Sequence, residues 1–410
     1  MHPNNMIEIT NYVSKILLTD KNSSYSILTY LDFEEDLTET FINNYINQVL
    51  LKNPILKKII VKKDDTSLFL DDAQSFNIND NYNIKYINKE QFDDYIKIMI
   101  NKPFSAEIKW NCLFCIDKDN KKSRMYFKIH HAYADGYKLI DILVSPFNNI
   151  DITKQFKRST QNIFDTIYYY IIGAILLTMV YIRFIFNILI RIFYNKENQE
   201  ITDITIPTDY IICKNLKLDE IKTFTKKHNI TVNDFLYSLM IKTDNLYRKQ
   251  EKILLIISPI NVSGLTETNN MCPIFNIVNN SHNNTTLLDK IHNIFNNLKY
   301  SLFIPGLSFI INNITSYIPL YILSSACKNL IENIDYTYSN IIGPSTKELN
   351  VKISDIHFLT TANNKEIIFN IISCENNMNI ICSFKKNGSI KNKEFYEKCI
   401  YEAYNSLLCV

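Results

Sequence analysis

The stretch His130-His-Ala-Tyr-Ala-Asp-Gly136 places two histidines side by side in a chain that has seven histidines among 410 residues. It follows an alternation of apolar residues, Met125, Phe127 and Ile129, which predicts a β-strand. A strand that ends at the pair would direct the two imidazoles to opposite faces, and the Asp-Gly would turn the chain into a helix. Because a neutral imidazole accepts protons near neutral pH, we expect acid–base chemistry at this point.

The same stretch also has structural explanations. Two histidines at a strand end can be structural, and Asp135 can cap the following helix, fix a histidine tautomer or pair with a cation. The pair with an Asp-Gly at this offset favours function. Metal binding is disfavoured, because no cysteine or carboxylate cluster lies nearby at ligand spacing. Cys112 and Cys115 form a lone Cys-x-x-Cys, which we interpret as buried thiols.

The composition sets broad limits. A chain of 410 residues is long for one domain and comfortable for two, and its net charge of +2 gives no reason to expect nucleic acid. Nine scattered cysteines do not resemble a disulfide framework, so we expect a reducing compartment. The first residues are polar and predict no secretory signal.

Three segments follow one another along the chain. Residues 1–160 and 201–410 mix predicted strands and helices, and residues 161–200 are apolar. In the first segment we expect helices at 39–51, 91–100 and 136–143, and strands at 55–62, 67–70, 111–117 and 123–131. In the last we expect helices at 218–228, 232–247, 287–302 and 392–408, and strands at 252–260, 336–342, 351–359, 366–373 and 378–384.

The apolar segment predicts membrane contact. No charged residue occurs from Thr166 to Ile182, and tyrosines that suit a membrane interface accompany the run. A buried core helix is the alternative. A single membrane crossing would separate the two flanking segments, so we expect a re-entrant or in-plane helical hairpin. Ser308–Ala326, a second apolar stretch, is expected to add a second membrane contact.

The histidine motif resembles a known signature. His-His-x-x-x-Asp-Gly is typical of the coenzyme A-dependent acyltransferase superfamily, and four further blocks make the chain resemble the bacterial-type wax ester synthase/diacylglycerol acyltransferase family. The first block ends at Trp110, where the family has Pro-Leu-Trp. The other three begin at Thr231 (Thr-Val-Asn-Asp), Ser258 (Ser-Pro-Ile-Asn-Val-Ser) and Tyr338 (Tyr-Ser-Asn-Ile-Ile-Gly-Pro). In the last block the family pattern is Ser-Asn-Val-Pro-Gly-Pro, so Ile342 replaces a proline. The usual arginine after the third block is absent.

Each block also has an ordinary explanation. Thr231 and Asp234 fit a helix capping box, Gly343 with the following proline fits a turn, and Trp110 fits a protein core. Asn233 is less easily explained. The occurrence of all five motifs in the family's order favours the resemblance.

The resemblance implies an α/β fold of two subdomains like chloramphenicol acetyltransferase around a central tunnel. It implies that His131 is the general base, that His130 and Asp135 are scaffold, and that Gly136 allows close packing. The residues that it assigns to substrate binding are Trp110, Asn233, Asp234, Ser339, Asn340 and Gly343. An oxyanion donor is also needed, and Asn233 and the Ser339–Asn340 segment are both candidates.

The implied activity is transfer of a fatty acyl group from acyl-CoA, as co-substrate, to a long-chain alcohol or diacylglycerol. No metal and no other cofactor is expected, and the expected surroundings are an intracellular membrane such as the endoplasmic reticulum, or a lipid droplet, with the site facing the cytosol. Two alternatives remain: a superfamily acyltransferase with another acceptor, and an inactive lipid-binding homologue.

Overall fold

The computed structural model describes residues 7–9, 14, 25–62, 68–73, 76–104, 108–147, 206–261, 271–280, 283–300, 304, 333–344, 351–362 and 366–410. The apolar segment at 161–200 and the second apolar stretch at 308–326 lie outside these ranges, so their predicted membrane contact stays a prediction. Among the described residues, no helix has both the length and the apolar character that a membrane crossing requires.

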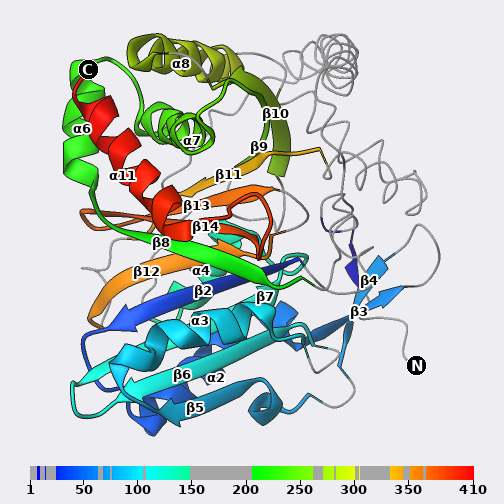
Figure 1. Ribbon diagram of the computed structural model, residues 1–410. Helices are drawn as coiled ribbons and strands as arrows, with labels where there is room; N and C mark the ends of the chain where they lie inside the picture. Colours follow the sequence, from blue (N-terminus) through cyan, green and yellow to red (C-terminus); the bar gives the residue numbers. More distant parts are fainter. Residues whose placement is uncertain are drawn as a thin grey trace.

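A five-stranded sheet forms the base of the N-terminal half (Figure 1). Its strands are antiparallel except for the parallel pair at one edge, β5 with β6. In spatial order they are β12 (Ile353–Thr360), β2 (Ser26–Phe33), β7 (Lys122–His130), β6 (Trp110–Asp117) and β5 (Tyr82–Tyr86).

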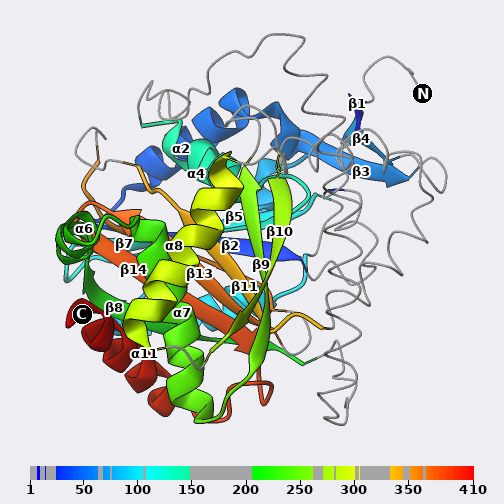
Figure 2. The ribbon, with the colours of Figure 1, turned by 90° about the horizontal axis from the view of Figure 1, so that it is seen from above.

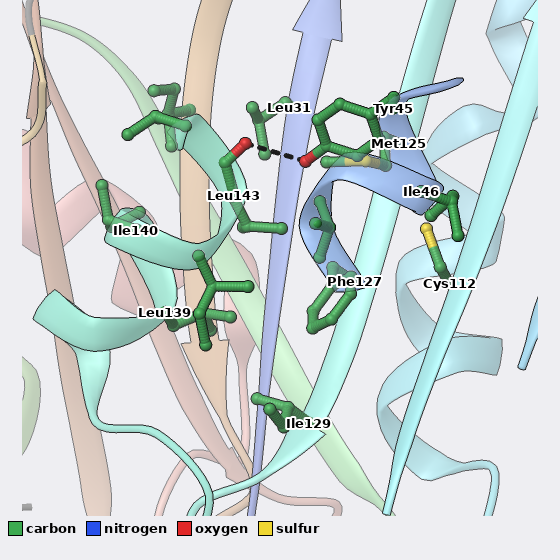
Figure 3. Packing of buried hydrophobic residues seen from close by; sticks show 14 of the residues in the cluster. Leu31, Tyr45, Ile46, Cys112, Met125, Phe127, Ile129, Leu139, Ile140 and Leu143 are labelled. Atoms are coloured by element: carbon green, nitrogen blue, oxygen red, sulfur yellow. Dashed lines mark hydrogen bonds between the residues drawn. The ribbon is translucent and has the colours of Figure 1, made fainter. Parts of the chain in front are cut away.

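Both faces of this sheet are covered. Along β2, Ile27 and Leu31 pack toward α2 (Glu39–Lys52) and α4 (Gly136–Val144), whereas Leu28 and Tyr30 pack toward α3 (Phe92–Asn101). Tyr45 of α2 donates a hydrogen bond from its phenol oxygen to the carbonyl of Leu143 at the end of α4, over 2.8 Å (Figure 3). The helices are thereby fixed to the sheet and to each other.

A six-stranded sheet forms the C-terminal half. One of its faces is covered by four helices, α6 (Leu218–Lys227), α7 (Val232–Arg248), α8 (Asn284–Tyr300) and α11 (Lys393–Leu408), as Figure 2 shows from above. In spatial order its strands are β10 (Met271–Asn279), β9 (Ile253–Asn261), β11 (Tyr336–Ile341), β13 (Ile367–Cys374), β14 (Asn377–Lys385) and β8 (Thr208–Lys217).

The two halves share a core and exchange a strand. Ile341, Ile372 and Cys374 of the C-terminal sheet belong to the same buried cluster as α2 and α4. β12 follows β11 in the chain but pairs with β2 of the N-terminal sheet, with Ile356 opposite Leu31 (Figure 1). The predicted division of the chain into segments at residues 160 and 201 does not account for this strand exchange, which joins the two halves.

A small three-stranded sheet lies beside the main body. β3 (Lys58–Lys62) and β4 (Leu68–Asp72) are antiparallel, and β1 (Ile7–Glu8) pairs with β4. The sequence predicts the β3–β4 hairpin but starts its first strand too early. Pro54–Lys57 instead forms a 3-10 turn, because proline at its first position suits a helical turn and has no N–H for a sheet.

Candidate active site

The histidine motif begins at the last residue of β7, between β2 and β6. The backbone holds it in place: His130 N–H donates to the carbonyl of Lys109 and His131 N–H to that of Tyr25, both over 2.8 Å. Tyr133 N–H then donates to the carbonyl of His130 over 3.0 Å and closes the turn. These bonds fix the path of the main chain on both sides of the histidine pair.

His130 is a buried residue of the scaffold. Its side chain is 2% exposed, and its Nδ1 accepts a hydrogen bond from Ala132 N–H over 3.2 Å. Burial, with the positive charges of His131, Lys109 and Lys128, lowers the pKa of His130 to about 3. His130 is therefore neutral near pH 7, and one of its nitrogens already has a partner.

His131 differs from its neighbour in exposure. It follows the end of β7, lies in the turn and is half-buried. One imidazole of the pair is thus packed in the interior, and the other is half-buried in the turn. This is the arrangement that strand alternation predicts.

The next part of the motif connects the turn to α4 and to the other half of the molecule. Asp135 is buried and caps α4, because its Oδ1 accepts from Lys138 N–H over 2.8 Å. Of the explanations open from the sequence, the structure shows the helix cap. A Cβ on Gly136 would lie 2.1 Å from Cδ1 of Ile341 in β11. The motif is therefore in direct contact with the C-terminal half at Gly136.

The end of β11 is attached to α7 through side chains. Asn233, near the start of α7, accepts at Oδ1 from the phenol of Tyr338 over 3.0 Å and from Nδ2 of Asn340 over 3.2 Å. Strand alternation directs Ser339 and Ile341 to the opposite face of β11, the face on which Ile341 approaches Gly136. Ser339 is thus on the motif side, whereas Asn340 is bonded on the α7 side.

The contacts of Asp234 stabilise the start of α7. It is 1% exposed and forms the predicted capping box with Thr231, in which each residue's backbone N–H donates to the other's side chain. Nδ1 of His292, in α8, lies 2.9 Å from Oδ2 of Asp234. The sequence gives no signal for His292, because it belongs to no motif and its contact is distant along the chain.

Gly343 and Trp110, the last two residues predicted to bind substrate, lie in different parts of the fold. Gly343 N–H donates to Ser373 Oγ over 3.1 Å, and a Cβ at Gly343 would lie 1.8 Å from the carbonyl oxygen of Ser373. Trp110 is fully buried, donates from Nε1 to the carbonyl of Leu56 over 2.8 Å and stacks on Phe127. The structure thus places Trp110 in the N-terminal core, and its assignment to substrate binding stays a prediction.

The described residues contain no group of three or more histidine, cysteine, aspartate or glutamate side chains suited to a metal ion. Cys112 and Cys115 are buried on opposite faces of β6, in two different core clusters. They therefore cannot bind one ion together, and burial raises the pKa of Cys115 to about 12.

Solved structures with this fold are acyltransferases and related domains. The wax ester synthase/diacylglycerol acyltransferase of Marinobacter aquaeolei matches with a TM-score of 0.60 and 10% identity, over 96% of this chain and 97% of that chain. The trichothecene 15-O-acetyltransferase of Fusarium sporotrichioides matches with a TM-score of 0.69 and 10% identity, over 98% and 95%. The polyketide synthase associated protein 5 of Mycobacterium tuberculosis matches with a TM-score of 0.58 and 12% identity, over 97% and 96%. A search among curated proteins found no match.

These similarities show the fold, and the α/β fold expected from the sequence is confirmed. Residues 273–407 match the family profile of the WS/DGAT C-terminal domain. That match confirms, over this part of the chain, the family resemblance indicated by the motifs.

Proposed function

We propose that this protein transfers a fatty acyl group from acyl-CoA to the hydroxyl of a long-chain alcohol or diacylglycerol. The observation that carries the proposal is the contact of Gly136 with Ile341. It joins the His-His-x-x-x-Asp-Gly turn to the end of β11, within a chain whose C-terminal part matches the WS/DGAT family. One site is then built from both halves, as an acyl transfer with two substrates requires.

The proposed base is His131. Its imidazole takes the proton from the acceptor hydroxyl while the alcohol oxygen attacks the thioester carbonyl. The tetrahedral intermediate then expels the CoA thiolate, which recovers the proton from His131, so that no acyl-enzyme forms. General-base help of this kind contributes about 10²–10⁴-fold to the rate, and the placement of the two substrates supplies much of the rest. His130 serves as scaffold.

The negative oxygen of the intermediate needs a donor. Asn233 uses its carbonyl oxygen for Tyr338 and Asn340, and Nδ2 of Asn340 donates to Asn233. We assign this role to the hydroxyl of Ser339, because Ser339 lies on the Gly136 face of β11, whereas Asn340 and Asn233 are bonded to each other on the α7 side. Asn233 and Asn340 would then position β11 and have no direct role in the chemistry.

The acceptor and the location complete the proposal. Lipid alcohols and diacylglycerols reside in membranes, so the apolar segments at 161–200 and 308–326 would bring the site to a membrane surface or lipid droplet. An intracellular membrane with the site on the cytosolic side supplies acyl-CoA directly.

The test is the release of CoA from palmitoyl-CoA by the purified full chain with hexadecanol, dioleoylglycerol, a fatty amine or no acceptor, with product detected by mass spectrometry. We expect esters with one of the first two acceptors, and a fall of at least 100-fold in His131→Ala with unchanged circular dichroism. His228→Ala, at the end of α6 among the outer helices, is the matched histidine control and should retain activity. Amide as the main product would overturn the acceptor assignment, and full activity in His131→Ala would overturn the mechanism.

A further inference from the structure

Tyr133, between the histidine pair and Asp135, connects the histidine turn to the small three-stranded sheet. Its side chain is 1% exposed, and its phenol oxygen donates a hydrogen bond to the carbonyl of Lys58 over 2.8 Å. Burial raises the pKa of Tyr133, so the phenol keeps its proton and remains a donor. The signature His-His-x-x-x-Asp-Gly leaves this position open. The bond is therefore a feature of this sequence and does not follow from the signature.

The carbonyl of Lys58 points away from the small sheet. In the part of the chain that the structure describes, β3 is an edge strand of this sheet and pairs with β4. The preceding carbonyl, that of Lys57, accepts from Ala73 N–H over 3.2 Å. Because bonds to one neighbour alternate along an antiparallel strand, the carbonyl of Lys58 is directed away from β4. Tyr133 therefore donates where an adjoining strand would place an N–H.

The segment that contains Lys58 is held independently of Tyr133. Trp110 donates from Nε1 to the carbonyl of Leu56 over 2.8 Å, and the ammonium of Lys58 is paired with the carboxylate of Asp72 in β4 over 2.9 Å. Loss of the Tyr133 phenol would therefore leave residues 56–58 in place. The effect of the loss falls on the turn that carries the histidine pair.

We propose that Tyr133 is a positioning residue that orients His131 by tying the histidine turn to the edge of β3. The inference rests on the proposed function, because it assigns to Tyr133 the alignment of the proposed base. Ser14 Oγ also donates to the turn, at the carbonyl of Ala132, but over 3.4 Å, so the 2.8 Å bond of Tyr133 is the stronger of the two. The main-chain bonds of His130 and His131 remain without the phenol, so its loss should shift the imidazole and leave the fold intact.

Tyr45 provides a matched control in the same core cluster. Its phenol also donates to a backbone carbonyl over 2.8 Å, that of Leu143, and its side chain is also buried (Figure 3). That bond joins α2 to the end of α4, whereas the motif lies at the start of α4. Tyr133→Phe and Tyr45→Phe remove the same group and the same kind of bond. They should therefore lower the midpoint of thermal unfolding by similar amounts.

The first measurement needs no activity. Hydrogen–deuterium exchange of peptides that cover residues 130–136 is followed in wild type and in both variants. We expect exchange in these peptides to be about tenfold faster in Tyr133→Phe, the order that one lost hydrogen bond gives, and unchanged in Tyr45→Phe. Unchanged exchange in Tyr133→Phe, or an equal change in both variants, overturns the inference.

The second measurement is kinetic and follows CoA release with the acceptor that wild type uses. In Tyr133→Phe we expect kcat to fall about tenfold, again the order of one hydrogen bond, with the KM for palmitoyl-CoA unchanged. Tyr45→Phe should keep the kcat of wild type, so stability alone would not explain the difference. Because the phenol acts through the imidazole, Tyr133→Phe should cause no further loss in His131→Ala. Equal kcat in the two tyrosine variants, or multiplied losses in the double variant, contradicts the inference.

The two measurements separate the two proposals. If wild type acylates no acceptor, the proposed function fails, and the exchange data still decide whether Tyr133 holds the turn. If wild type is active and Tyr133→Phe loses kcat without faster exchange at residues 130–136, Tyr133 acts by another route and the positioning role is wrong.

Discussion

The motif turn and the end of β11 meet at Gly136, but they are held in different ways. The turn at residues 130–133 is fixed by main-chain hydrogen bonds to Lys109 and Tyr25. The end of β11 has main-chain pairing with β13 and, in addition, a side-chain attachment to the amide of Asn233 on α7. A main-chain bond is insensitive to most substitutions, whereas a side-chain bond is lost with a single residue. The attachment of β11 to α7 is thus more sensitive to a single substitution than the turn that carries the histidine pair.

Gly343 and Gly136 give the sharpest test of the difference between a main-chain contact and a side-chain contact. At Gly343 an added methyl would meet the backbone carbonyl oxygen of Ser373, which cannot move aside, whereas at Gly136 it would meet the flexible end of Ile341. Gly343→Ala should reduce the free energy of unfolding by about 3 kcal/mol and Gly136→Ala by about 1 kcal/mol, the two ends of the range for overpacking. Urea denaturation measures both. Ile341→Val removes Cδ1 and should restore Gly136→Ala, and equal losses at the two glycines would contradict the contrast.

The side-chain attachment of β11 is broken most directly at Asn233. Asn233→Ala removes the side-chain acceptor of the Tyr338 phenol and of the Asn340 amide, leaves the phenol only its 3.4 Å bond to the carbonyl of residue 233, and should cost about 2 kcal/mol of stability. Tyr338→Phe removes one bond and leaves no buried donor unpaired, so it should cost about 1 kcal/mol or less. Thermal unfolding in parallel decides the order. A greater loss in Tyr338→Phe would indicate that Asn233 is not the centre of this attachment.

The buried member of the histidine pair makes stability depend on pH. The folded pKa of His130, about 3, lies below the value near 6.5 of an exposed histidine, so the unfolded state binds the proton first as the pH falls. The contribution of His130 is complete above pH 6.5 and is lost progressively toward pH 3. Between pH 7 and pH 5.5 the loss should be about 1 kcal/mol. His130→Gln should show a shallower decline in urea denaturation over this range, and an identical slope would exclude His130 as the cause.

The smallest effect is expected at Asp135. Its observed role is to cap α4, and asparagine caps a helix about as well, so Asp135→Asn should change stability by about 0.5 kcal/mol or less. Asp135→Ala, which has no cap, should cost about 1 kcal/mol. A large loss of CoA release in Asp135→Asn at normal stability would give this carboxylate a role beyond capping.

Local patterns in the sequence predict much of the fold. The helix at 232–247 and the strand at 336–342 are found within a residue or two of α7 and β11, because apolar periodicity and a capping box are local signals. β1, β2, β5, β8 and β10 are not predicted by the sequence. β2 is buried on both faces, so it lacks the polar alternation that identifies a half-exposed strand. The pairing of β12 with β2 depends on contacts between distant residues, which no local pattern contains.

In the candidate site, too, local patterns are predicted from the sequence and contacts between distant residues are not. The motif identifies His131, and Asn233 is noticed because a capping box does not explain it, yet its bonds to Tyr338 and Asn340 appear only in the folded chain. Trp110 carries a family signal and is a core residue.

The pairing of β12 with β2 also determines when the molecule can be completed during synthesis. β2, β5, β6 and β7 all precede residue 131, but the strand that covers the free edge of β2 ends at Thr360. Until that residue leaves the ribosome, the edge presents unpaired N–H and C=O groups that attract other chains. A nascent chain of this protein therefore needs protection from aggregation for most of its translation, and the N-terminal sheet is completed only near the end.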